Sequence, residues 1–197
     1  MLCRAARTDV PAIVALLADD DLGATRDGIR TEADLAVYQC AFDAIDRDPA
    51  QLLVVAEAGG RLVATLQLMF LPGLSHRGAV RAQIESVRVA AGLRGHGLGQ
   101  AVMTWAIGEA RRRGCSLVQL STNKSRSDAH RFYERLGFVA SHEGMKPGSR
   151  GRPSACPRPR RPRRPAARGN PDRLRTRTTE GGPDPPARGR SSCSWPV

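Results

Sequence analysis

The residues with the clearest chemical meaning form a glycine-rich segment that follows the apolar run 87–91. It consists of Arg94, Gly95, His96, Gly97, Leu98, Gly99 and Gln100, and the run before it is apolar except for Arg88. A strand that ends in such a turn and opens into a helix leaves several backbone N–H groups pointing at one place, with the positive end of the helix dipole behind them. Glycine lets the backbone come close to a ligand and adopt positive φ. The segment therefore predicts a binding site for a phosphate-bearing ligand.

The spacing of these glycines excludes two common phosphate loops. The chain has no Gly-Lys-Ser/Thr, which a Walker loop requires, and position 100 is Gln where a dinucleotide fingerprint needs glycine. The pattern that remains is Arg94-x-x-Gly97-x-Gly99.

This pattern resembles the pyrophosphate loop of the GNAT superfamily of N-acetyltransferases. Ile84–Val89 is similar to the strand that precedes the loop in that family, and the segment Ala129-His-Arg-Phe-Tyr-Glu-Arg-Leu-Gly-Phe138 is similar to its later helix-and-strand signature. The resemblance covers about residues 2–146 and implies an acetyl-CoA-dependent N-acetyltransferase. It also implies an α/β layered fold in which helices flank a central mixed sheet that is splayed between its fourth and fifth strands.

The resemblance implies two groups of residues that contact acetyl-CoA. Backbone groups near Val87 and Val89 would pair with the pantetheine arm and the thioester carbonyl, and residues 94–100 would bind the pyrophosphate. Asn123 would hydrogen-bond the arm or the acceptor, with an ordinary turn asparagine as the equal alternative. Arg126 stands where many relatives have Asn, so its contact with coenzyme A is either replaced by a charge contact to phosphate or lost.

Two residues are candidates for acid–base catalysis. Strand alternation places Glu85 on one face with Val87 and Val89, which makes Glu85 the best general base; the alternative is a structural salt bridge to Arg81 or Arg88. Tyr133 stands where the family has the acid that protonates the coenzyme A thiolate, and the alternative is a tyrosine half packed in the core.

The elements that must position these residues follow from periodicity and turn chemistry. We expect a first strand over 2–7, a helix over 9–18, a helix over 31–45 capped by Thr31 and Asp34, and a hairpin of strands 52–58 and 61–71 around Gly59-Gly60. Four further elements follow: a strand over 80–89, a helix from 98 that ends at Gly114, a strand over 117–121, and a helix up to 136 that is capped by Ser125 or Ser127. Residues 138–141 would begin a last, truncated hairpin.

Composition divides the chain at about residue 147. Residues 1–146 hold 18 Lys/Arg and 16 Asp/Glu, whereas residues 147–197 hold 13 Arg, no Lys, 3 acidic residues and 11 of the 14 prolines. We expect residues 1–146 to form one domain and the rest to be disordered. The tail is a nucleic-acid-binding segment, a solvated segment without a role, or the product of a shifted reading frame, which its composition favours.

The charges within residues 1–146 bear on the acceptor. Residues 1–60 hold 11 acidic and 5 basic residues, and the family's acceptor-lining segment contains Asp19, Asp20, Asp21 and Asp27. These carboxylates would steer an ammonium substrate or form a merely solvated loop. We predict a primary amine of a small molecule as acceptor, such as an aminoalkylphosphonate or an aminoglycoside. The alternatives are a catalytically silent module that binds coenzyme A, or a protein acetyltransferase whose tail contacts nucleic acid.

The remaining features give expectations about location and metals. The five cysteines are widely spaced without a CxxC, the four histidines have no ligand spacing, and the first residues lack an apolar signal region. We expect a cytoplasmic enzyme without a metal, a membrane partner or a nucleic-acid partner. The oligomeric state, monomer or homodimer, stays open.

Overall fold

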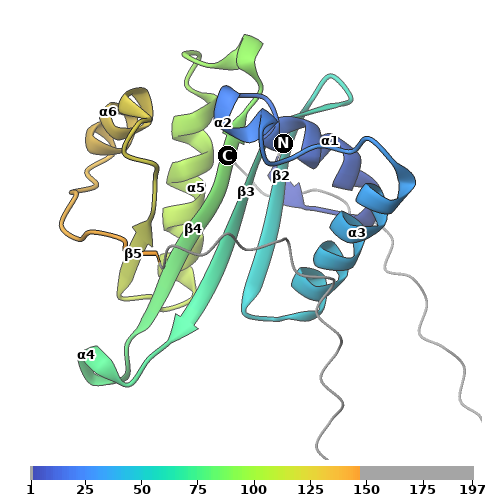
Figure 1. Cartoon of the computed structure of the whole chain (residues 1–197). Helices are drawn as coiled ribbons and strands as arrows, with labels where there is room; N and C mark the ends of the chain where they lie inside the picture. Colours follow the sequence, from blue (N-terminus) through green and yellow to red (C-terminus); the bar gives the residue numbers. More distant parts are fainter. Residues whose placement is uncertain (1, 147–197) are drawn as a thin grey trace, which may run out of the picture.

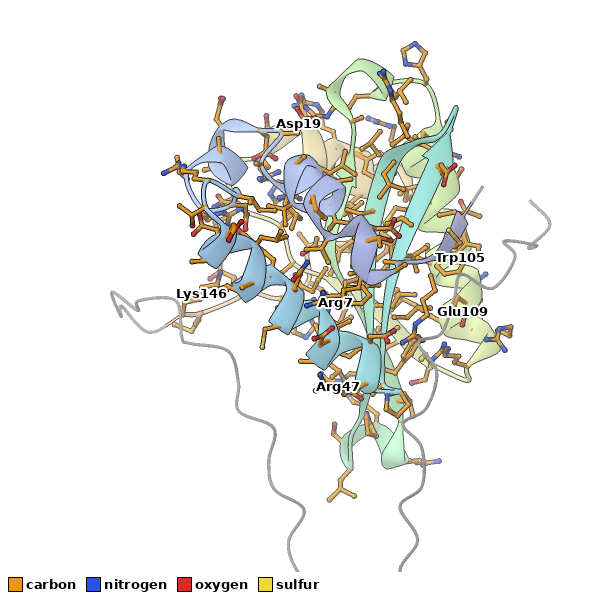
Figure 2. The ribbon with its side chains drawn as sticks, turned by 90° about the vertical axis from the view of Figure 1, so that its right-hand side faces the viewer. Arg7, Asp19, Arg47, Trp105, Glu109 and Lys146 are labelled. Carbon is orange, nitrogen blue, oxygen red and sulfur yellow. The ribbon has the colours of Figure 1, made fainter. Side chains whose placement is uncertain are left out.

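The computed structural model describes residues 2–146, in which a five-stranded sheet is covered by helices on both faces. In Figure 1 the strands stand side by side, and Figure 2 shows Arg7 and Arg47 on one side of the sheet and Trp105 and Glu109 of α5 on the other. The elements are β1 (Leu2–Arg4), η1 (Arg7–Asp9), α1 (Val10–Leu17), α2 (Asp21–Ala24), α3 (Glu32–Arg47), β2 (Gln51–Ala58), β3 (Arg61–Pro72), α4 (Ser75–Gly78), β4 (Val80–Val89), η2 (Ala91–Leu93), α5 (Leu98–Arg112), β5 (Leu117–Leu120) and α6 (Ser127–Arg135).

The strands lie in the order β1-β2-β3-β4-β5, and only the last pair is parallel. The β2–β3 hairpin turns at Gly59 and Gly60, whose φ values of 56° and 75° suit a two-residue hairpin turn. Thr31 caps α3 in a capping box with Asp34, as predicted. The predicted mixed sheet flanked by helices is therefore confirmed.

Two apolar clusters hold the layers together. Leu66, Leu68, Ile84 and Met103 are among the fully buried residues of the cluster between the sheet and α5. A second cluster joins α1 and α3 to the other face, where Val55 is fully buried against Ile13, Val14 and Phe42. Burial on both faces explains why β3 is a nearly continuous apolar run.

The β4–β5 pair is splayed. β5 pairs with β4 only from Arg81 to Ile84, whereas β4 continues to Val89. Beyond Ile84, the edge of β4 that faces β5 therefore has no strand partner within residues 2–146, as the predicted splay requires.

Several predicted boundaries are wrong. The first strand stops at Arg4 because the chain enters a 3-10 turn. The helix expected over 9–18 is α1 at Val10–Leu17; Asp9 precedes it, and the carboxylate of Asp9 accepts the N–H of Ala6 at 2.8 Å. Neither Ser125 nor Ser127 caps α6, since its N-cap residue is Arg126. Residues 138–146 form no strand in the described part of the chain. The predictions about residues 147–197 lie outside the described residues.

Candidate active site

The predicted phosphate-binding segment forms the turn between β4 and α5. Gly95 and Gly97 have φ of 79° and 81°, and a Cβ at either position would meet nothing within 4 Å. Gly97 directly precedes the first residue of α5, so the first three amides of that helix, 98–100, have no carbonyl of their own helix to bond. Residues 91–97 are exposed. An open backbone with free helix N–H groups fits a phosphate group.

Gly99 has a different role from the other two glycines. It lies inside α5, and a Cβ on it would come within 3.3 Å of Cζ of Phe132 and 3.7 Å of Cγ2 of Val89. The missing side chain therefore lets the first turn of α5 approach both the end of β4 and α6.

The side chain of Arg94 fastens the loop to the rest of the protein. Its Nε donates to the carbonyl of Val89 at 3.0 Å, and its Nη2 donates to the carbonyl and the carboxylate of Asp19 at 2.8 and 3.1 Å. Asp19 also accepts the N–H of Ala91 at 2.8 Å. His96 turns back onto the carbonyl of Arg94 at 2.9 Å. In this arrangement the guanidinium orders the turn, and the backbone of the turn is what faces outward.

A bulge in β4 changes which residues share a face. The pairing with β3 shifts between Thr65 and Gln67, and Ser86 of β4 has a φ of 55°. Val87 and Val89 pack with Ile84 in the cluster beneath α5, whereas Glu85 bonds along its own face to Gln83. The prediction that Glu85 shares a face with Val87 and Val89 is wrong, because the extra residue at the bulge breaks the two-residue alternation.

A line of polar side chains orients Glu85. Gln119 donates to Gln83 at 2.7 Å, and Gln83 donates to Oε1 of Glu85 at 2.8 Å. Ser121 lies 3.5 Å from the same oxygen. No salt bridge joins Glu85 to Arg81 or Arg88 in the described part of the chain. Oε1 is thus held by neutral donors, and Oε2 has no hydrogen-bond partner within residues 2–146.

Tyr133 is packed among aromatic rings on α6. Its ring lies 5.2 Å from that of Phe132 and 6.0 Å, edge on, from that of Phe138. Burial raises the pKa of Tyr133, while the charges of Arg88 and Arg126 lower it and that of Glu85 raises it further. Tyr133 is therefore a protonated phenol at neutral pH, close to the carboxylate that is the candidate base.

Arg126 and Asn123 are both engaged within the protein. The guanidinium of Arg126 forms two parallel bonds with Asp20, at 2.8 and 2.9 Å. Oδ1 of Asn123 accepts the N–H and the hydroxyl of Ser125, both at 2.9 Å, which is the turn geometry given as the alternative.

Two of the four carboxylates in the acidic segment after α1 are paired with arginines. Asp19 is paired with Arg94, and Asp20 with Arg126 and, at 3.7 Å, with Arg88. Asp27 accepts the hydroxyl of Tyr38 at 3.3 Å. The expected steering of a cation is wrong for Asp19 and Asp20, because each carboxylate has an arginine partner, whereas Asp21 and Asp27 have no ion-pair partner within residues 2–146. These pairs are not predictable from the sequence. It suggests Arg88 only as a partner of Glu85, and the charge of Asp20 gives no sign that its partner, Arg126, lies 106 residues away.

Comparisons with known proteins agree with this geometry. The chain belongs to the Acetyltransferase (GNAT) family, whose model matches residues 15–138. It is 34% identical to an aminoalkylphosphonate N-acetyltransferase of Salmonella typhimurium (strain LT2) over 114 residues. This alignment covers 58% of this chain and 73% of that protein. The protein is therefore an acetyl-CoA-dependent acyltransferase.

Solved structures share the fold. The crystal structure of a protein described as a transcriptional regulator from Bacillus halodurans C-125 is 44% identical, with a TM-score of 0.70, and the match covers 74% of this chain and 97% of that one. An acetyltransferase of Trypanosoma brucei is 26% identical with a TM-score of 0.60, and the match covers 74% and 96% of the two chains.

Two further observations concern metals and membranes. Residues 2–146 contain no cluster of three or more His, Cys, Asp or Glu side chains that could hold a metal ion. None of the helices in this part of the chain has both the length and the apolar character needed to cross a bilayer.

Proposed function

We propose that this enzyme acetylates the primary amine of a small molecule by direct attack, with Glu85 as general base and Tyr133 as general acid. The observation that carries the proposal is the unpaired edge of β4 beyond Ile84, which has the glycine turn at its end and both Glu85 and Tyr133 close by. Acetyl-CoA, when bound, supplies the activated acyl group and a thiol as leaving group.

The residues of the chain divide the work as follows. Backbone amides at the start of α5 bind the phosphates. The edge of β4 near Val87 and Val89, which has no strand partner within residues 2–146, takes an extended arm beside the carbonyls that already accept the side chains of Arg88 and Arg94. Glu85 accepts a proton from the ammonium of the acceptor, directly or through water, as the amine nitrogen bonds to the acyl carbon. Tyr133 donates its proton to the sulfur as the carbon–sulfur bond breaks, and its phenolate takes the second proton that the nitrogen releases as the amide forms.

The state of each side chain supports its role. The hydrogen bonds from Gln83 and Ser121 hold one oxygen of Glu85 and leave the other for the incoming amine. The raised pKa of Tyr133 keeps its proton in place until the thiolate forms. The relative from Salmonella is named for its action on aminoalkylphosphonates, which supports an acceptor of that size.

The test is a thiol-release assay with acetyl-CoA and a panel of acceptors that includes aminoalkylphosphonates, simple alkylamines, an aminoglycoside and a lysine peptide. Thiol release should depend on a small amine, and mass spectrometry should find the N-acetyl product. Glu85→Gln should lower kcat/KM by about 10²-fold, because one acid–base group contributes on that scale. Glu134→Gln, which changes an exposed carboxylate one residue after Tyr133, is the control and should leave the rate unchanged.

Three results would contradict the proposal in whole or in part. Binding of acetyl-CoA without thiol release for any amine would favour the silent binding module, and acetylation of the peptide alone would favour a protein acetyltransferase. A Glu85→Gln variant as active as wild type would remove Glu85 from the mechanism.

A further inference from the structure

A cluster of two arginines and one aspartate lies where α2, β4 and the start of α6 meet. Arg126 forms its two-pronged contact with Asp20, and Nε of Arg88 lies 3.7 Å from the same carboxylate. The side chains of Arg88, Asp20 and Arg126 are only 15%, 22% and 24% exposed. These charges are therefore largely shielded from water.

The positive charge of the cluster exceeds its negative charge. Arg126 uses both oxygens of Asp20, so Arg88 is left with one hydrogen bond, from Nη1 to the carbonyl of Val87 at 2.8 Å. Nε of Arg88 is buried without a hydrogen-bond partner within residues 2–146. Burial lowers the pKa of Arg88, and the charges of Arg126 and Arg26 lower it further against the pull of Asp20. A buried donor without an acceptor costs free energy that a bound anion would recover.

The cluster lies beside the groups assigned to catalysis. Arg88 is on the part of β4 that follows the bulge and has no β5 partner. Arg88 and Arg126 are both close enough to Tyr133 to affect its pKa, as is Glu85. An anion held by the two arginines would therefore lie on the same side of the site as the groups assigned to acid–base catalysis.

We propose that Arg88 and Arg126 bind the oxyanion of the acceptor, and that the enzyme selects small amines that carry a phosphonate or carboxylate close to the amino group. This inference rests on the proposed function and adds the feature by which the substrate is recognised. Guanidinium groups suit such oxyanions because their N–H groups match the spacing of the oxygens. A polycation such as an aminoglycoside would meet excess positive charge, since Asp19 and Asp20 are already paired.

Two acceptors of matched length test the selection. The thiol-release assay compares 2-aminoethylphosphonate with propylamine, which lacks the oxyanion, for wild type and for Arg126→Gln. We expect wild type to favour the phosphonate by about 10²-fold in kcat/KM, the scale of a charge-assisted pair, and the variant to lose most of that preference, measured as the ratio of its two kcat/KM values. Arg126→Lys should fall between them, because it keeps the charge and loses the fork. Arg111→Gln, an exposed arginine at the end of α5, is the control.

Calorimetry with an unreactive anion gives a second readout that needs no turnover. Methylphosphonate should bind wild type and Arg111→Gln equally and bind Arg126→Gln at least 10-fold more weakly. The affinity for coenzyme A should be the same in all three proteins. Thermal unfolding shows whether each variant is folded.

Each adverse result has a distinct meaning. Equal use of propylamine and 2-aminoethylphosphonate by wild type, or no binding of methylphosphonate, would overturn the oxyanion site and leave amine acetylation intact. A parallel loss of coenzyme A affinity in Arg126→Gln would assign the arginines to the phosphates of the donor and also overturn it. Absence of activity on every amine would instead refute the proposed function, and methylphosphonate binding would still decide whether the oxyanion site exists.

Discussion

The phosphate-binding turn can be tested at Gly97 with two residues of nearly equal shape. Asn and Asp both tolerate the left-handed conformation that φ of 81° imposes, so Gly97→Asn and Gly97→Asp should cause similar strain. A Cβ there meets nothing within 4 Å, so neither side chain is excluded by the fold. The two variants differ only in one negative charge at the start of α5.

That charge should act in opposite directions on stability and on binding. A carboxylate at a helix N-terminus is favourable by about 0.3–1 kcal/mol, so Gly97→Asp should be at least as stable as Gly97→Asn. A phosphate bound to the same amides would lie about 5 Å from the carboxylate. Two unit charges at that distance repel by about 1–3 kcal/mol between the dielectric of water and that of a protein surface. Gly97→Asp should therefore bind coenzyme A about 5- to 150-fold more weakly than Gly97→Asn.

Calorimetry at low salt measures the affinities, and thermal denaturation measures the stabilities. Pantetheine, which lacks the pyrophosphate, is the control ligand and should bind both variants equally. Added salt should narrow the gap for coenzyme A, because the turn is exposed. Equal affinity of the two variants for coenzyme A would show that the phosphates bind elsewhere and would refute the assignment of residues 94–100.

Three further outcomes follow from the site and its packing. Tyr133→Phe should lower kcat by about 10²-fold with little change in acetyl-CoA affinity. Because burial raises the pKa of Tyr133, the pH–rate profile of the wild type should show the loss of this phenol's proton only above pH 10, the ordinary pKa of tyrosine. For Asp20, burial opposes ionisation, but the hydrogen bonds from Arg126 and Gly23 and the charge of Arg88 outweigh it and lower the pKa. Its contribution to stability is thus present above pH 3.8 and lost as pH falls through the lower folded value. Denaturant unfolding should therefore find Asp20→Asn less stable than wild type by about 1–3 kcal/mol at pH 7, and the difference should shrink as pH falls below 3.8. Gly108→Ala, whose new Cβ would meet open space, should stabilise the protein by about 1 kcal/mol in the same assay. Gly99→Ala should not be stabilising, because its Cβ would contact the ring of Phe132. Equal stabilisation by both substitutions would show that the ring of Phe132 moves aside without cost.

Local signals explain why much of the fold could be predicted. The hairpin turn depends on Gly59 and Gly60, the start of α3 on Thr31 and Asp34, and the phosphate-binding turn on Gly95 and Gly97. In each case residues a few positions apart determine the geometry, so spacing alone carries the information. The expectation that β4 and β5 splay apart came from the resemblance to the family, because no local pattern in either strand indicates it.

The parts of the site that could not be predicted depend on distant or unmarked features. The bulge in β4 occurs at Ser86, a residue type that gives no sign of a φ of 55°, so alternation placed Glu85 on the wrong face. The pairs Arg94–Asp19 and Arg126–Asp20 join residues 75 and 106 positions apart. A count of charges along the sequence makes the region after α1 acidic. In the folded protein, two of its carboxylates are paired with arginines that come from other parts of the chain.

The close approach at Gly99 fixes a length inside the active site. Phe132, which occupies the space that a side chain on Gly99 would fill, is the immediate neighbour of Tyr133 on α6. Packing of Phe132 against the start of α5 thus helps to set the separation between the phosphate-binding turn and α6, which carries the phenol. We expect this separation to make the enzyme selective for the length of its acyl donor. A donor whose arm is shorter or longer than pantetheine would bind its phosphates at the turn but place its sulfur out of reach of Tyr133.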